Sequence, residues 1–136
     1  MVCRSTATVL ATLLVTTVLA SNANAFDLDG AWATDDSQCA KVFVRKADQY
    51  AFSDNSDVYG GGFIVSGDHI TGKYARCRIK ARKDTEQNVN LLASCASDIM
   101  LQDVQLSARV LDSNSIVRKF PGMEDIEIKY YRCALK

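Results

Sequence analysis

The chain has 136 residues, 48% of them hydrophobic, and its 16 Lys and Arg are balanced by 16 Asp and Glu. This balance argues against a nucleic-acid-binding domain, which is usually strongly basic. The length allows one domain with a modest core.

The first 25 residues have the pattern of a secretory signal peptide. Arg4 lies in a short polar segment, which is followed by the apolar stretch TVLATLLVTTVLA and then by Ala23-Asn24-Ala25, a small-residue cleavage site. The apolar stretch is shorter than the roughly 18 residues that a transmembrane helix needs. We therefore expect cleavage after Ala25, export to the periplasm without a membrane span, and one mature domain over residues 26–136. No feature of the sequence indicates an oligomeric state.

Most of the mature domain alternates between apolar and polar residues in short runs bounded by turn residues, which is typical of β-strands. One segment, Asp35–Val44, instead predicts a short helix, with an acidic N-terminal turn. The predicted strands are Tyr50–Ser53, Gly62–Ser66, His69–Thr71, Lys73–Arg82, Val89–Ala96, Val104–Leu111, Ser115–Phe120 and Ile126–Cys133. This spacing predicts an all-β, mainly antiparallel domain, either a small eight-stranded barrel or a sandwich.

Four cysteines remain in the mature domain, and an even number in an exported chain predicts two disulfides. A zinc site made of four thiolates is the alternative, but the sequence has no C-x-x-C pair. Three connectivities are possible. A hairpin register discussed next favours Cys77–Cys95, which leaves Cys39–Cys133.

The hairpin joins the segment Tyr74–Lys83 to the strand Val89–Ala96. A turn centred on Glu86 places Cys77 opposite Cys95, and the same register sets Ile79 opposite Ala93 and Ala81 opposite Leu91. These residues share one apolar face, because alternate residues of a strand point the same way. The opposite face then carries a basic stripe of four residues, Arg76, Arg78, Lys80 and Arg82. We interpret it as a solvated face, or alternatively as a surface for an anionic partner in the cell envelope.

No catalytic site is indicated. The one histidine, His69, has no second histidine to build a metal site, and the segment DNSDVYGGG lacks the closing Glu of a calcium loop. The glycines 60–62 are typical of a bulge or an open loop beside a strand. The sequence therefore predicts a protein that is not an enzyme and has neither a metal nor a cofactor.

Two short features resemble the calycin barrels, Gly30-Ala31-Trp32 at the start of the mature domain and Arg132 in its last strand. In calycins the Trp closes one end of the barrel and the Arg stacks on its ring. The resemblance implies a lipocalin-like eight-stranded barrel with Trp32 and Arg132 at its closure. It also implies an alternative function, the binding of a small ligand inside the barrel.

Size, export and disulfides also resemble the periplasmic inhibitors that Gram-negative bacteria make against hydrolases. Inhibitors of secreted metalloproteases use an arm before G-x-W, where this chain has only Phe26–Asp29. Inhibitors of c-type lysozyme use an S-G-x-x-Y motif and a following Lys; here residues 66–70 read SGDHI, with Ile at the Tyr position. The resemblance implies a protein partner, c-type lysozyme or another peptidoglycan hydrolase, whose catalytic cleft a loop would block. The candidate contact residues are Tyr59, Ser66, Thr71, Lys73 and Tyr74.

Overall fold

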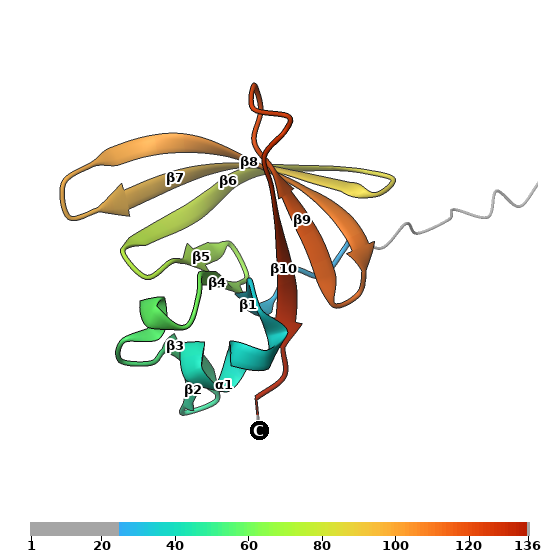
Figure 1. Ribbon diagram of the computed structural model, residues 1–136. Helices are drawn as coiled ribbons and strands as arrows, with labels where there is room; N and C mark the ends of the chain where they lie inside the picture. Colours follow the sequence, from blue (N-terminus) through green and yellow to red (C-terminus); the bar gives the residue numbers. More distant parts are fainter. Residues whose placement is uncertain (1–24, 136) are drawn as a thin grey trace, which may run out of the picture.

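Eight antiparallel strands close into a barrel in the computed structural model, which describes residues 25–135 (Figure 1). Around the barrel the strands follow the order β1-β10-β9-β8-β7-β6-β5-β4. Their bounds are β1 (Gly30–Ala33), β4 (Gly62–Ser66), β5 (His69–Thr71), β6 (Ala75–Thr85), β7 (Asn88–Ser97), β8 (Leu101–Asp112), β9 (Ser115–Lys119) and β10 (Glu127–Cys133). The predicted all-β class and eight-stranded barrel are confirmed. The predicted signal peptide, residues 1–25, lies outside the described residues except for Ala25.

The helix predicted at Asp35–Val44 is shorter than expected. It begins as a 3₁₀ turn at Asp36–Gln38 and continues as α1 (Cys39–Val42). The carboxylate of Asp35 accepts a hydrogen bond from the backbone N–H of Ser37 at 2.9 Å, so the expected N-terminal cap is present. The prediction was wrong at the C-terminal end, because residues 43 and 44 belong to a strand.

That strand, β2 (Phe43–Lys46), forms a separate two-stranded sheet with β3 (Gln49–Phe52). The turn between them has left-handed backbone at Ala47 (φ 48°) and Asp48 (φ 65°), as in the tight turns that twist a hairpin correctly. In sequences such a turn is usually marked by Asn-Gly, so the Ala-Asp pair gave no sign of a hairpin. Without that sign, the apolar residue Phe43 fitted the pattern of the predicted helix, whereas in the structure it pairs with Phe52 on β3.

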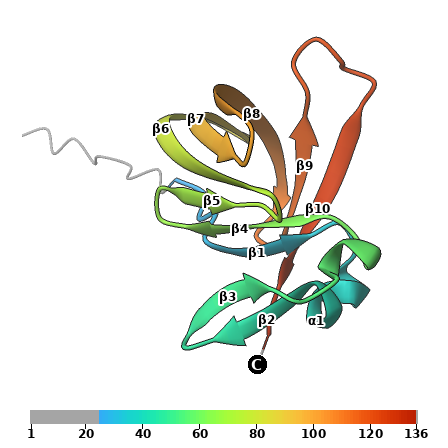
Figure 2. The same cartoon turned by 90° about the vertical axis from the view of Figure 1, so that its left-hand side faces the viewer.

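The β2–β3 hairpin and α1 lie beside β1 on the outside of the barrel (Figure 2). They cover its outer face there and form a second apolar cluster of buried residues, namely Ala31, Ala33, Val42, Phe43, Ile64 and Cys133. The disulfide Cys39–Cys133 joins this layer to β10. Gly62 is needed at the contact, since a Cβ at this position would lie 2.6 Å from the Trp32 carbonyl oxygen and 2.8 Å from the Phe43 ring.

The inside of the barrel holds the main core. The buried residues of this core are Leu28, Trp32, Val65, Ile70, Val89, Leu91, Ile116 and Tyr130. Phe63 links two of the aromatic rings: its centroid lies 6.3 Å from that of Trp32 and 4.9 Å from that of Tyr130. Both disulfide pairings predicted from the sequence are confirmed, Cys77–Cys95 within the barrel wall and Cys39–Cys133 outside it. The zinc alternative is excluded, because these disulfides use all four thiols.

The β6–β7 register is as predicted at one end and shifted at the other. Cys77 lies opposite Cys95, and Ile79 lies opposite Ala93, as expected. A bulge follows Ile79, so Ala81 lies opposite Leu92 rather than Leu91. Since one extra residue turns every later side chain to the other face, Arg82 points into the barrel instead of joining the basic stripe. The predicted four-residue stripe was therefore wrong in its last member.

Candidate ligand-binding cavity

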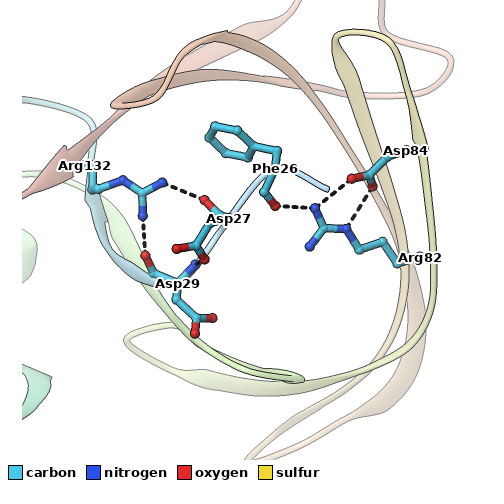
Figure 3. A network of polar contacts seen from close by, with 6 residues as sticks. All are labelled: Phe26, Asp27, Asp29, Arg82, Asp84 and Arg132. Carbon is cyan, nitrogen blue, oxygen red and sulfur yellow. Dashed lines mark hydrogen bonds and ion pairs between the residues drawn. The ribbon is translucent and has the colours of Figure 1, made fainter. Parts of the chain in front are cut away.

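The segment Phe26–Asp29 crosses one end of the barrel, which we call the closed end (Figure 3). The indole N–H of Trp32 donates to the Leu28 carbonyl oxygen at 2.8 Å. The guanidinium of Arg132 lies over the Trp32 ring, 4.3 Å from its centroid. This is a cation–π contact, and it joins Arg132 of the last strand, β10, to Trp32 of the first strand, β1.

Arg132 also holds the crossing segment by hydrogen bonds. Its guanidinium donates to the carbonyl oxygens of Asp27, at 2.6 Å, and of Asp29. It donates as well to the carbonyl oxygen of Ser113 at 3.1 Å, in the β8–β9 turn. Because the planar guanidinium offers five donors, one side chain ties the segment to the turn and to the ring of Trp32.

Arg82 holds the same segment from the opposite wall, as Figure 3 shows. It donates to the Phe26 carbonyl oxygen and makes two hydrogen bonds of 2.8 Å to the carboxylate of Asp84. The side chains of Arg82 and Asp84 keep only 30% and 28% of their surface exposed. The hydrogen bonds from Arg82 hold the pKa of Asp84 below its usual value, against partial desolvation, which raises it.

Above this closed end the barrel encloses a cavity of about 370 Å³. Its walls are mostly apolar, and the residues that line them include Leu28, Phe63, Val65, Ile70, Cys77, Val89, Leu91, Cys95, Leu106, Ile116 and Tyr130. At the other end of the barrel the cavity is lined by small residues: Gly62 begins β4, Gly72 lies in the loop before β6, and Ala75 begins β6. We call this second end the open end, because the crossing segment Phe26–Asp29 closes the barrel at the other one.

Three residues with polar side chains, Gln102, Ser107 and Arg118, also line the cavity. None of the three was predicted from the sequence as a site residue. The sequence did contain a signal for Arg118. It lies two residues after Ile116 in β9, so the two side chains are on the same, apolar face of that strand. A cation at an inward position of a barrel strand is unusual enough to mark a site.

The predicted inhibitor-contact residues are divided between the two ends. Ser66 lies at the β4–β5 turn, next to the closed end, whereas Thr71 ends β5 toward the open end. Lys73 and Tyr74 follow in the loop to β6, and both contact the loop that carries Tyr59. The Lys73 ammonium donates to the Ser53 carbonyl oxygen at 3.2 Å, and the Tyr74 hydroxyl donates to the Asp57 carboxylate at 3.1 Å.

That bond to the Asp57 carboxylate raises the pKa of the exposed Tyr74 hydroxyl, because the phenolate would lose the hydrogen bond and face a negative charge. Tyr59 lies under the Lys41 ammonium, 5.1 Å from its ring centroid. The structure therefore gathers Tyr59, Lys73 and Tyr74 on neighbouring loops and leaves Ser66 away from them.

The remaining basic stripe, Arg76, Arg78 and Lys80, lies on the outer face of β6. Arg78 pairs with Asp68 at 3.1 Å, and Lys80 pairs with Asp103 at 3.2 Å. Two of the three cations are thus matched by carboxylates on neighbouring segments. A surface built to attract a polyanion would leave its cations unmatched, so this face is mainly a solvated one with surface ion pairs.

No family model, no curated protein and no solved structure matches this chain. Within residues 25–135, every helix is too short or too polar to cross a bilayer. The two disulfides are typical of proteins that fold in an oxidising compartment.

Proposed function

We propose that this protein binds a small, mainly apolar molecule inside its barrel. The observation that carries the proposal is the cavity of about 370 Å³ with mostly apolar walls and one open end. Ligand pockets in proteins usually measure about 300–1,000 Å³ and combine apolar walls with a few polar groups, and this cavity has both properties. An apolar ligand would gain free energy because it leaves water for those walls.

The closed end supports the proposal because it makes a rigid floor. Arg82 and Arg132 anchor the crossing segment from opposite walls by side-chain hydrogen bonds, and the Cys77–Cys95 disulfide cross-links β6 to β7 in the barrel wall. A site that is rigid before binding loses little conformational entropy when the ligand enters. We further propose that the protein works in the periplasm, where the predicted signal peptide would deliver it and where disulfides persist.

Titration with N-phenyl-1-naphthylamine, a neutral apolar fluorophore, tests the proposal. Trp32 is the only tryptophan of the chain and stacks on the cavity-lining Phe63, so a probe in the cavity should quench its emission by energy transfer. We expect saturable binding with one probe per chain. Ala75→Phe should weaken it at least tenfold, because Ala75 lines the cavity, whereas Ala81→Phe, on the outer face of the same strand, should leave it unchanged. Equal binding by both variants, or no saturable binding by the wild type, would count against the proposal.

A second proposal keeps the predicted role as an inhibitor of c-type lysozyme or another peptidoglycan hydrolase. The observation that favours it is the group of exposed loop residues Tyr59, Lys73 and Tyr74, of which Tyr74 is 72% exposed. A tyrosine hydroxyl and a lysine ammonium are groups that could engage the two carboxylates of a lysozyme cleft. Cell-wall turbidity should then fall more slowly when the mature protein is added, and Tyr74→Ala should abolish the effect. Unimpeded lysis at a stoichiometric excess would end this proposal.

The third function considered, recognition of an anionic envelope partner by the basic stripe, has less support. Arg78 and Lys80 already pair with carboxylates, which leaves Arg76 as the stripe's remaining cation. Retention on an anionic matrix that falls with salt, and falls further in Arg76→Gln, would be needed to revive it.

A further inference from the structure

Arg118 places a positive charge inside the barrel. On β9 it lies opposite Ala108 of β8 and opposite Ile128 of β10. Residues directly opposite in antiparallel strands share a face, and Ala108 and Arg118 both line the cavity. The guanidinium therefore belongs to the cavity wall rather than to the outer surface.

This cation is not matched within the part of the chain that the structure describes. Its Nε atom is inaccessible to solvent and has no hydrogen-bond partner among residues 25–135. Buried donors nearly always have a partner, so an orphaned one points to a group that is supplied from outside the chain. The guanidinium carbon lies 4.7 Å from the centroid of the Phe120 ring, at the distance of a cation–π contact.

The charged groups next to Arg118 already have partners of their own. Lys119, the next residue, points outward and contacts the carboxylate of Glu127, which also lies 3.8 Å from Arg109. At the closed end, the inward carboxylate of Asp84 is already paired with Arg82. The carboxylates of Glu127 and Asp84 are thus engaged by other cations, and those of Asp27 and Asp29 in the crossing segment accept backbone N–H groups. Gln102 and Ser107 are the other residues with polar side chains in the wall.

We infer that the ligand is an amphipathic monoanion: an apolar body fills the cavity, and a carboxylate or similar oxyanion pairs with the guanidinium of Arg118. This inference rests on the proposed binding function. A guanidinium suits such a group because its parallel N–H donors match two oxygens of the anion. The apolar walls strengthen the pairing, since they exclude water and lower the local dielectric.

A matched pair of probes tests the inference. N-phenyl-1-naphthylamine is neutral, and 8-anilino-1-naphthalenesulfonate has the same ring system with one sulfonate added. Arg118→Gln should weaken the binding of the sulfonate probe by about tenfold or more, which is the usual effect of losing hydrogen bonds to a charged group. The affinity for the neutral probe should change by less than about threefold. Arg76→Gln, which removes one cation from the outer face of β6, is the matched control and should change neither.

The outcomes separate this inference from the proposed function. If the neutral probe binds and Arg118→Gln leaves the affinity of the sulfonate probe unchanged, or weakens both probes equally, the anion inference is overturned while the binding function stands. If neither probe binds inside the barrel, the binding function itself fails.

A measurement on the wild type removes any dependence on how well Arg118→Gln folds. Decanoate and decanol have the same chain and differ in the charged group. Decanoate should displace N-phenyl-1-naphthylamine at a concentration at least tenfold lower at neutral pH, and this advantage should vanish once the pH falls below the carboxyl pKa. Displacement at equal concentrations, or a preference for decanol, would overturn the inference.

Discussion

Replacement of Arg82 by Gln should weaken the closed end of the barrel. The change removes two hydrogen bonds of 2.8 Å to Asp84 and the donation to the Phe26 carbonyl oxygen. A hydrogen bond to a charged group contributes about 1.5–3 kcal/mol, but about 30% of each side chain is still exposed, so water screens part of this. We therefore expect the free energy of unfolding to fall by about 1–2 kcal/mol at neutral pH.

The loss should depend on pH, and its sign follows from the pKa of Asp84. The hydrogen bonds from Arg82 lower this pKa in the folded protein, against partial desolvation. A lowered folded-state pKa stabilises the protein above the unfolded-state value, near 3.9, and the stabilisation is lost as the pH falls through the folded-state value. The cost of Arg82→Gln should therefore be complete at pH 7 and should shrink below about pH 4.

Urea unfolding under oxidising conditions, followed by Trp32 fluorescence, measures these quantities. The set is the wild type, Arg82→Gln, Asp84→Asn and the double variant, and the two single changes should be coupled by about 1 kcal/mol. Arg76→Gln removes an outer-face cation and should cost less than about 0.5 kcal/mol. A cost of Arg82→Gln that matches this control, or that is the same at pH 7 and pH 3, would refute the role of the pair.

Three further predictions concern the backbone and the cross-links. Gly62→Ala should lower the free energy of unfolding by about 1–3 kcal/mol because its Cβ would collide with backbone and a buried ring, while Gly61→Ala, with its nearest contact at 3.6 Å, should cost much less in the same urea assay. Ala47→Asn should raise the free energy of unfolding by about 0.5 kcal/mol, and with it the melting temperature, since Asn tolerates the left-handed backbone of this turn better than Ala does. An unchanged or lower melting temperature would contradict this. Replacement of Cys39 and Cys133 by Ala should cost about 1.5 kcal/mol more than removal of the other disulfide, because their sequence separation is 94 rather than 18; equal costs would argue against the chain-entropy explanation.

The barrel itself could be predicted from the sequence for physical reasons. Period-two alternation decides which side of a strand is apolar, and the positions of Cys77 and Cys95 restrict how two such strands pair. Those two constraints agree, so the hairpin and both disulfides were predicted correctly. The same reasoning failed after Ile79, because a bulge needs no special residue and one inserted position reverses every later side chain.

The cavity could not be predicted, because whether a barrel interior is filled depends on how side chains from eight strands meet. Leu106, Ile116 and Tyr130 read as ordinary core residues in the sequence, yet they leave a space between them. The polar group in that space was also missed, although Arg118 sits at an inward position of its strand. The exposed loop residues Lys73 and Tyr74 were identified from their chemistry, and their contacts with the neighbouring loop needed the structure.

The central claim is that an apolar molecule binds inside the barrel, and methyl NMR tests it most directly. The spectra would be recorded for the oxidised mature domain with and without N-phenyl-1-naphthylamine. We predict that the methyl shifts of Val65, Leu91 and Leu106, which line the cavity, change on saturation, whereas those of the exposed Val58 and Leu111 stay in place. Shifts confined to the exposed methyl groups, or no shifts at all, would contradict the account.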